Sequence, residues 1–193
     1  MQGKPLIVCS DNLQQQAAIT SKLAVDYDKI IGCTLHQLEV LVERYVDCIL
    51  VVSWQRPSAE LSMIVDHASC HKIPLLILLR QLNQNDINRL PEPNGYVMLP
   101  ADSQFDLSAW VFRAEQVRQC QRQQESEIEQ LTQQLADRKW VEKAKGLLMQ
   151  HHGLDEESAF KALRTASMNN SQSLAQVARN IVHTLSVISG SRT

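Results

Sequence analysis

The side chains best suited to chemistry in this 193-residue chain are cations gathered toward its C-terminal end. Residues 138–193 carry 8 Lys and Arg against 4 Asp and Glu, whereas residues 1–137 carry 11 against 17. Such a charge asymmetry favours a polyanion as the partner of the basic part. The cations that could neutralise phosphate groups there are Arg138, Lys139, Lys143, Lys145 and Arg164.

Three further residues of the same region could complete a nucleic-acid contact. Asn169 and Asn170 stand in a polar turn, from which amide groups could reach base edges. Gly146 would allow close approach of RNA or of another helix. Each residue also has a structural alternative, because a helical glycine often serves packing and a single lysine is often only solvated.

Catalysis finds little support in the sequence. It contains no Gly-rich phosphate loop and no GxSxG or HExxH motif. His151 and His152 are adjacent, so on a helix they point about 100° apart and cannot jointly hold a metal ion. The acidic run 155–157 fits a solvated first helical turn better than an acid–base pair. We expect no enzyme activity, no cofactor and no metal site.

Composition and cysteine usage indicate a cytoplasmic protein. The 44% of hydrophobic residues suffice for a real core. The five cysteines are scattered, odd in number and without a CxxC pair, which is typical of core thiols in a reducing compartment. The N-terminus lacks the apolar region of a signal peptide, and no apolar run reaches the roughly 18 residues that span a bilayer. We therefore expect a soluble protein without membrane contact.

Residues 1–115 alternate between strand-like and helix-like patterns of apolar residues. Apolar runs predict strands at 5–10, 29–34, 47–53, 74–79 and 95–99. Amphipathic segments predict helices at 12–25, 35–45, 59–70 and 83–90. Continuously apolar strands between amphipathic helices predict a parallel sheet covered on both faces. Five such units match the α/β flavodoxin-like fold with strand order 2-1-3-4-5.

A flavodoxin-like domain of this size resembles a two-component receiver. The resemblance implies acidic residues after the first strand and a phospho-accepting Asp at the end of the third. It also implies a Ser or Thr after the fourth strand and a Lys-Pro pair after the fifth. In this sequence the first strand is followed by one carboxylate, Asp11, and the acceptor position falls on Val52 or Ser53.

The remaining receiver positions depart from the pattern too. The fourth strand ends in Leu79 and Arg80, and Leu99 stands where the lysine before Pro100 belongs. Mg²⁺ binding needs convergent carboxylates, and phosphoryl transfer needs a nucleophile and charge neutralisation. We expect a degenerate receiver that takes no phosphate, with Asp11 in a loop or capping role. A bound partner or ligand would then exert control.

A long helix is predicted from about residue 103 to 150, without Pro and with Gly146 as its single Gly. Spacings of three and four form a heptad seam. The seam consists of Trp110, Ala114, Val117, Gln121, Gln124, Ile128, Leu131 and Leu135. An exposed helix with an apolar seam is unstable alone, so we expect residues 103–137 to form a coiled coil with a second copy. A solvated linker helix is the alternative.

Residues 138–193 predict a three-helix unit. The long helix continues to Gln150, Gly153 breaks it, and two further helices are expected at 155–168 and 174–188. The expected apolar core of this unit includes Leu147, Leu148, Met149, Phe160, Leu163 and Met168.

The segment from Arg138 to about residue 185 resembles the ANTAR domain of AmiR/NasT-type antitermination regulators. The matching positions are Ala144 to Met149, Gly153, Glu157, Ala159, Leu163, Arg164, Met168, Val177, Ala178 and Ile181. Ser167 departs from the pattern, which favours alanine. The resemblance implies binding to paired hairpin loops in a leader mRNA and read-through of a terminator. It also implies a homodimer, a ligand-sensing repressor protein as partner, and nitrogen assimilation as the regulated process.

Two other functions compete with this one. A DNA-binding regulator would use the last two helices as a helix-turn-helix, but their connection lacks the usual turn glycine and the third helix carries only Arg179. A protein-interaction scaffold would bind a sensor and no nucleic acid.

Overall fold

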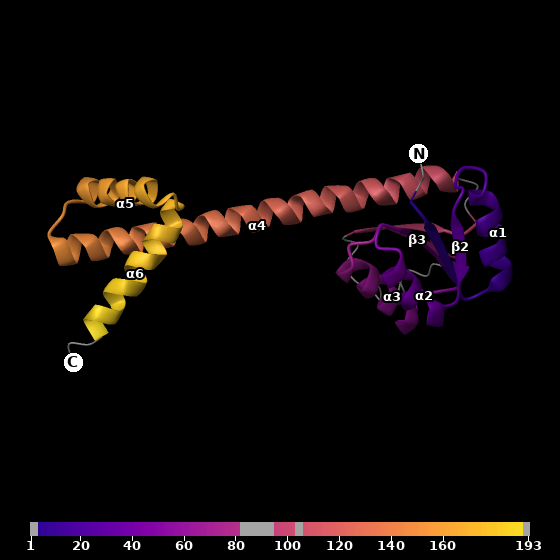
Figure 1. The fold of residues 1–193 in the computed structure, drawn as a ribbon. Helices are drawn as coiled ribbons and strands as arrows, with labels where there is room; N and C mark the ends of the chain where they lie inside the picture. Colours follow the sequence, from indigo (N-terminus) through magenta and orange to yellow (C-terminus); the bar gives the residue numbers. More distant parts are fainter. Residues whose placement is uncertain (1–3, 82–94, 103–105, 191–193) are drawn as a thin grey trace. The chain divides into compact units, whose positions relative to one another are not determined.

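The computed structural model describes residues 4–81, 95–102 and 106–190 (Figure 1). The chain divides into two compact units, Met1–Gln124 and Glu125–Thr193. The short helix expected at 83–90 lies outside the described residues.

The first unit contains a parallel sheet with the strand order β2-β1-β3-β4-β5, as predicted. Its strands are β1 (Leu6–Ser10), β2 (Ile30–Cys33), β3 (Ile49–Trp54), β4 (Leu75–Leu79) and β5 (Tyr96–Pro100). Every residue of β3 and β4 is buried, because helices cover both faces of a parallel sheet. The α/β flavodoxin-like fold is therefore confirmed.

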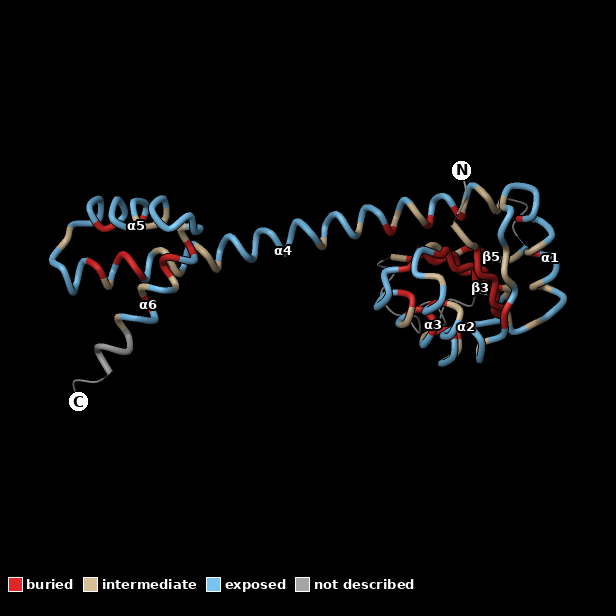
Figure 2. The backbone as a smooth tube through the Cα atoms, in the orientation of Figure 1, coloured by how far each residue is buried: buried red, intermediate tan, exposed pale blue. Residues whose placement is uncertain are grey.

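Helices pack on both faces of this sheet, and the sheet separates two clusters of buried apolar residues (Figure 2). They are α1 (Leu13–Leu23), α2 (Leu35–Arg44), α3 (Ala59–Cys70) and the beginning of α4 (Leu107–His152). One face packs against α2 and α3 through residues such as Leu38 and Leu61. The other packs against α1 through Ile19 and against α4 through Val111 and Ala114.

Side-chain caps determine where the first helices begin. The Oδ1 atom of Asn12 accepts the backbone N–H groups of Gln14 and Gln15 at 2.9 and 3.2 Å, which caps α1. Ser58 caps α3 by accepting the N–H of Leu61 at 3.3 Å. Because Asn12 is the cap, the preceding Asp11 is a loop residue whose carboxylate is available for other contacts.

Three of the cysteines meet the expectation of core thiols and two do not. Cys9, Cys33 and Cys48 are buried, whereas Cys70 and Cys120 are exposed on helices. Cys9 and Cys33 are register partners on β1 and β2, and a hydrogen bond between their thiols, with burial, raises the pKa of Cys9. Among the described residues, no helix combines the length and apolarity that a bilayer crossing requires.

The second unit consists of the last part of α4 with α5 (Glu156–Asn170) and α6 (Leu174–Gly190). Its buried core contains Ala144, Leu148, Ala159, Leu163, Val177, Ala178 and Val182. Gly153 has φ +65° just after α4, so the predicted break is confirmed at a conformation that glycine adopts without strain.

Part of the core expected for this unit lies at its surface. Phe160 is 42% exposed and Met168 72% exposed, and Met149 is exposed as well. The prediction failed because α5 buries only a narrow strip, at Ala159 and Leu163. A small residue at the centre of a helix contact brings the backbones close, and side chains at the edge of the strip then project past the neighbouring helices.

The predicted heptad seam of α4 has two environments. Trp110 and Ala114 pack into the core of the first unit, so this part of the seam is occupied within one chain. Ile128, Leu131 and Leu135 are each more than half exposed. The free apolar seam is therefore shorter than the sequence predicted.

Candidate nucleic-acid interface

Two predicted lysines and a glycine lie along one exposed face of α4. Lys139, Lys143 and Gly146 follow spacings of four and three, which places them on one side of the helix, and all three are exposed. Lys143 lies with its Nζ atom 5.8 Å from the centre of the Trp140 ring. We refer to Lys139, Lys143 and Gly146 as the α4 strip. Arg138 is also exposed, on another face of the helix.

The glycine of the α4 strip serves no packing contact within the unit. Apart from the adjacent residues and the nearby backbone of α4 itself, no described atom lies within 4 Å of the position that a Cβ atom would take at Gly146. A glycine inside a helix destabilises it by roughly 0.5–1 kcal/mol relative to alanine. Since the fold does not require Gly146, its open backbone favours close approach by a partner outside this chain.

Lys145 differs from the other predicted cations because carboxylates already surround it. It is only 9% exposed, and its Nζ atom lies 2.7 Å from Glu156 Oε1 and 2.9 Å from Glu142 Oε2. The hydrogen bond to Glu156, followed by that to Glu142, raises the pKa of Lys145. The same bond lowers the pKa of Glu156. Lys145 therefore joins α4 to the first turn of α5 and has no charge left unpaired for phosphate.

The predicted residues of α5 lie at its surface and its end. Arg164 is exposed on the helix, and Asn169 and Asn170 are exposed at its last residues. Asn170 Nδ2 donates to the carbonyl of Ala166 at 2.9 Å, which leaves its Oδ1 atom for a partner. The turn that follows begins at Ser171, which has φ +50°. The prediction that Asn169 and Asn170 stand in the turn is therefore wrong, because the helix continues to Asn170 and both residues belong to the last turn of α5.

Beyond the first turn of α5, every Lys, Arg, Asp or Glu of the unit is a cation. No Asp or Glu follows Glu157 in the sequence. Within the described part of the chain, neither Lys161 nor Arg164 forms an ion pair. Arg179 of α6, by contrast, donates to Asp137 Oδ1 at 2.8 Å. Among the residues that the structure describes in this unit, the Lys and Arg side chains left for a polyanion therefore lie on α4 and α5, and Arg179 of α6 is paired within the unit.

The strand ends of the first unit carry no phosphorylation machinery. Ser10, Ser53, Leu78 and Leu99 are successive register partners across β1, β3, β4 and β5. We refer to these four residues as the strand-end row. Two serines and two leucines provide neither convergent carboxylates nor a lysine. Ser53 is fully buried.

An internal cation neutralises the one carboxylate beside this row. Arg80 Nη2 lies 2.5 Å from Asp11 Oδ1, and the backbone N–H of Gln55 donates to Asp11 Oδ2 at 2.8 Å. Both carboxylate oxygens are thus engaged by the protein, and a Mg²⁺ ion would have to displace Arg80. Among the described residues, no three His, Cys, Asp or Glu side chains are grouped to hold a metal ion.

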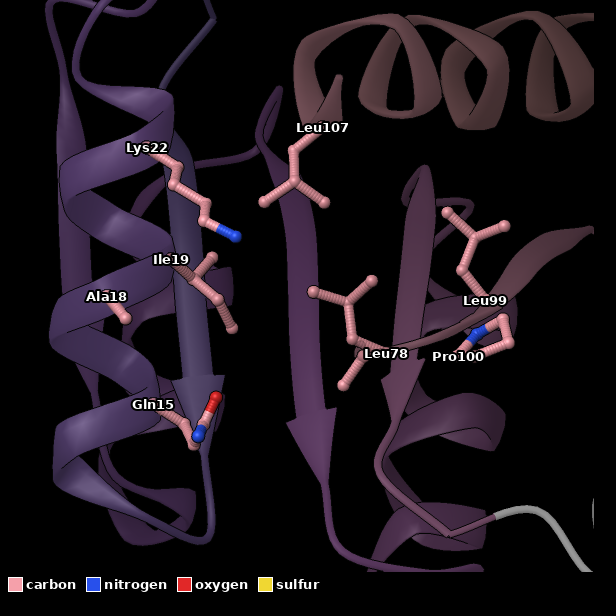
Figure 3. A pocket seen from close by; sticks show the side chains of 9 residues that line it. Gln15, Ala18, Ile19, Lys22, Leu78, Leu99, Pro100 and Leu107 are labelled. Atoms are coloured by element: carbon pink, nitrogen blue, oxygen red, sulfur yellow. The ribbon is translucent and has the colours of Figure 1, made fainter. Parts of the chain in front are cut away.

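A small pocket lies next to the strand-end row (Figure 3). Ile19, Leu78, Leu99 and Leu107 supply most of its apolar wall, and Lys22 extends toward it from α1. Its volume is about 40 Å³, whereas ligand pockets measure roughly 300–1,000 Å³. The pocket can hold water molecules and is too small for a metabolite.

Comparisons with known proteins show which proteins the second unit is similar to. Residues 129–182 match the family model of the ANTAR domain, and all eight predicted contact residues lie inside this range. The chain is 35% identical over 114 residues to the nitrate regulatory protein of Klebsiella oxytoca, across 55% of this chain and 28% of that protein. It is 41% identical over 61 residues to the transcriptional regulatory protein PdtaR of Mycobacterium tuberculosis, across 32% of this chain and 30% of the relative.

These matches thus cover less than a third of either relative's length. Among solved structures, the response regulator StyR, known at low resolution, is similar with 16% identity and a TM-score of 0.46, across 94% of this chain and 100% of that one.

Proposed function

We propose, from the premise that the chain contains an ANTAR domain at residues 129–182, that it is an RNA-binding regulator of transcription antitermination. It binds hairpin loops in a leader mRNA and allows RNA polymerase to pass a terminator. The observation that carries this proposal is the set of cations on α4 and α5 that form no ion pair, with the open backbone of Gly146 on the same face of α4 as Lys139 and Lys143. Specific RNA recognition targets unstacked loop bases, and cations supply the phosphate contacts.

The proposed contact residues follow from these positions. Phosphate contacts come from Arg138, Lys139, Lys143 and Arg164, and base-edge contacts from Asn169 and Asn170. Lys145 leaves this set, because its ammonium group is already paired with Glu142 and Glu156.

A second copy of the chain is the proposed occupant of the exposed α4 seam. Ile128, Leu131 and Leu135 repeat at spacings of three and four, the pattern with which helices pair in coiled coils. A parallel homodimer would hold two ANTAR domains together, so that one dimer engages two hairpin loops.

Control passes through a bound protein, a ligand-sensing repressor, in place of phosphorylation. The strand-end row and the ion pair between Asp11 and Arg80 support this, because they leave neither an acceptor nor a metal site. The name of the relative from Klebsiella oxytoca supports nitrogen assimilation as the regulated process.

A salt titration tests the RNA function. The full chain is titrated with a two-hairpin leader RNA, the same RNA without its loops, and duplex DNA of equal length, each at several salt concentrations. We expect the intact RNA to bind most tightly. Equal and weak affinity for all three would overturn the proposal. The pairing of Arg179 with Asp137 argues against α6 as a DNA recognition helix, so duplex DNA serves as the control.

A further inference from the structure

One flank of α5 combines an aromatic ring, a thioether and two cations. Phe160, Arg164 and Met168 follow one another at spacings of four, and Lys161 lies close to Met168 around the helix. All four are exposed, with Phe160 at 42% and Met168 at 72%. We refer to these four residues as the α5 flank. It adjoins the buried strip of Ala159 and Leu163 and is separate from it.

The charges around this flank select the kind of partner that fits it. Lys161 and Arg164 form no ion pair within the described part of the chain. The nearest carboxylates along the helix are Glu156 and Glu157 in its first turn. Glu156 is bound to Lys145, whereas Glu157 precedes Phe160 by three residues and Lys161 by four, on the same side of the helix. From Ser158 onward the sequence is free of acidic residues. A polyanion therefore meets attraction at Lys161 and Arg164, and repulsion from Glu157 at the N-terminal end of the flank, beside Phe160.

The order of side chains along the flank resembles the order of groups along a single strand of RNA. Apolar, cationic and apolar side chains alternate at Phe160, Arg164 and Met168, as bases and phosphates alternate in the strand. An aromatic ring stacks on any base, and a neighbouring Arg neutralises the adjoining phosphate. A protein partner that buried an apolar surface would instead have to desolvate Arg164 in its middle.

We infer that the α5 flank receives an unpaired base of an RNA hairpin loop. The Phe160 ring stacks on the base, Met168 covers its edge, and Arg164 with Lys161 binds the phosphates on either side. The inference rests on the proposed RNA function and assigns to it a base-contacting residue outside the cationic set that the sequence predicted.

The first test substitutes the ring and keeps its apolar character. In the full chain, Phe160→Leu should weaken binding to the two-hairpin RNA by about 10- to 100-fold, the range of one lost base–aromatic stack, without changing the salt dependence. Arg164→Ala should reduce the slope of log affinity against log salt by about 1. The matched control is Phe112→Leu, because Phe112 is an exposed phenylalanine of the first unit, at 58%. This control should bind like the wild type.

The second test locates the base. Each loop nucleotide is made abasic in turn, and every RNA is titrated against wild type and Phe160→Leu. At one loop position, removal of the base should weaken binding to the wild type by the same factor as the Phe160→Leu substitution does. At that position, removal of the base should not weaken binding to Phe160→Leu any further. A fluorescent 2-aminopurine at that position should be quenched when the wild-type protein binds, a measurement that does not depend on the folding of any variant.

The outcomes separate the two proposals. If the wild type prefers the hairpin RNA but Phe160→Leu binds it equally well, or if no loop position shows quenching, the α5 flank does not contact a base and the RNA function stands. If the wild type binds hairpin RNA no better than duplex DNA, both proposals are overturned.

Discussion

Lys145 and Lys143, two residues apart on α4, have opposite environments. Lys145 Nζ lies 2.7 Å from Glu156 Oε1 and is nearly buried, whereas Lys143 is exposed with its ammonium over the Trp140 ring. Positions two apart on a helix point about 200° away from each other, so one lysine faces α5 and the other faces solvent. The same residue type therefore joins two helices of the unit at one position and leaves its charge available to a polyanion at the other.

This contrast predicts different defects for two matched variants. Lys145→Met should lower the free energy of unfolding of the second unit, because it leaves Glu156 without its partner, and it should leave the salt slope of RNA binding unchanged. Lys143→Met should leave stability nearly unchanged and reduce that slope by about 1. Denaturant unfolding and RNA titrations at several salt concentrations measure both. A stability defect in Lys143→Met together with a reduced salt slope in Lys145→Met would contradict the interpretation.

The same ion pair predicts a pH dependence of stability. Lys145 lowers the pKa of Glu156, so the stabilisation is fully present above the ordinary value of 4.5 and is lost as pH falls through the lowered folded-state value. The pKa of Lys145 is raised, so its contribution is fully present below 10.5 and is lost as pH rises through the folded-state value.

Glu156→Gln isolates the acidic limb of this dependence. Thermal unfolding should show the variant less stable than wild type at pH 7, and the difference should be smaller at pH 3. A difference of the same size at both pH values would show that Glu156 acts through packing and not through its charge.

Gly146→Ala should stabilise the protein and weaken RNA binding. The added methyl group meets no described atom within 4 Å outside the nearby part of α4, and the substitution removes a helical glycine, a gain of up to about 1 kcal/mol. Gly153→Ala is the control, because its φ of +65° is strained for alanine, and it should destabilise. Unfolding experiments and RNA titrations test the pair. Unchanged RNA affinity of Gly146→Ala would exclude close approach at this point.

Leu131→Lys should convert a dimer into a monomer. Leu131 lies at the centre of the exposed seam, and two lysines facing each other across a pair of helices repel. Val46→Lys serves as control, since Val46 is highly exposed in the first unit and away from the seam. Sedimentation equilibrium should report a dimer for wild type and Val46→Lys. A monomeric wild type would contradict the coiled coil.

Incubation with acetyl phosphate and Mg²⁺ should leave the mass of the intact chain unchanged. Asp11 is held by Arg80 and the Gln55 amide, and the strand-end row contains no carboxylate. Mass spectrometry reads the result directly. A gain of one phosphoryl group would show that the first unit still accepts phosphate.

The fold of the first unit was predictable because its signals are local and repeated. Each strand is a continuous apolar run and each helix has its own period, so strand order followed from the known behaviour of such alternations. The break at Gly153 was predictable for the same reason, since one residue type suits that backbone conformation.

The arrangement of the second unit was less accessible, because it depends on contacts between helices. Glu142 stands three residues before Lys145, and that pair could have been found by helical spacing. Glu156 reaches Lys145 only because α5 turns back after Gly153, which periodicity does not report. Phe160 and Met168 have the character of core residues, and their exposure depends on how narrow a strip of α5 the neighbouring helices cover.

The internal ion pair between Asp11 and Arg80 also bears on how the proposed control would behave over time. A phosphorylated receiver keeps its state for the lifetime of a covalent bond and consumes ATP to reach it. Here the counter-ion of Asp11 is a side chain of the same chain. Under the control by a bound protein that we propose, the output is an equilibrium quantity, set by the stoichiometry and affinity of that protein, and it reverses without a phosphatase when the protein leaves.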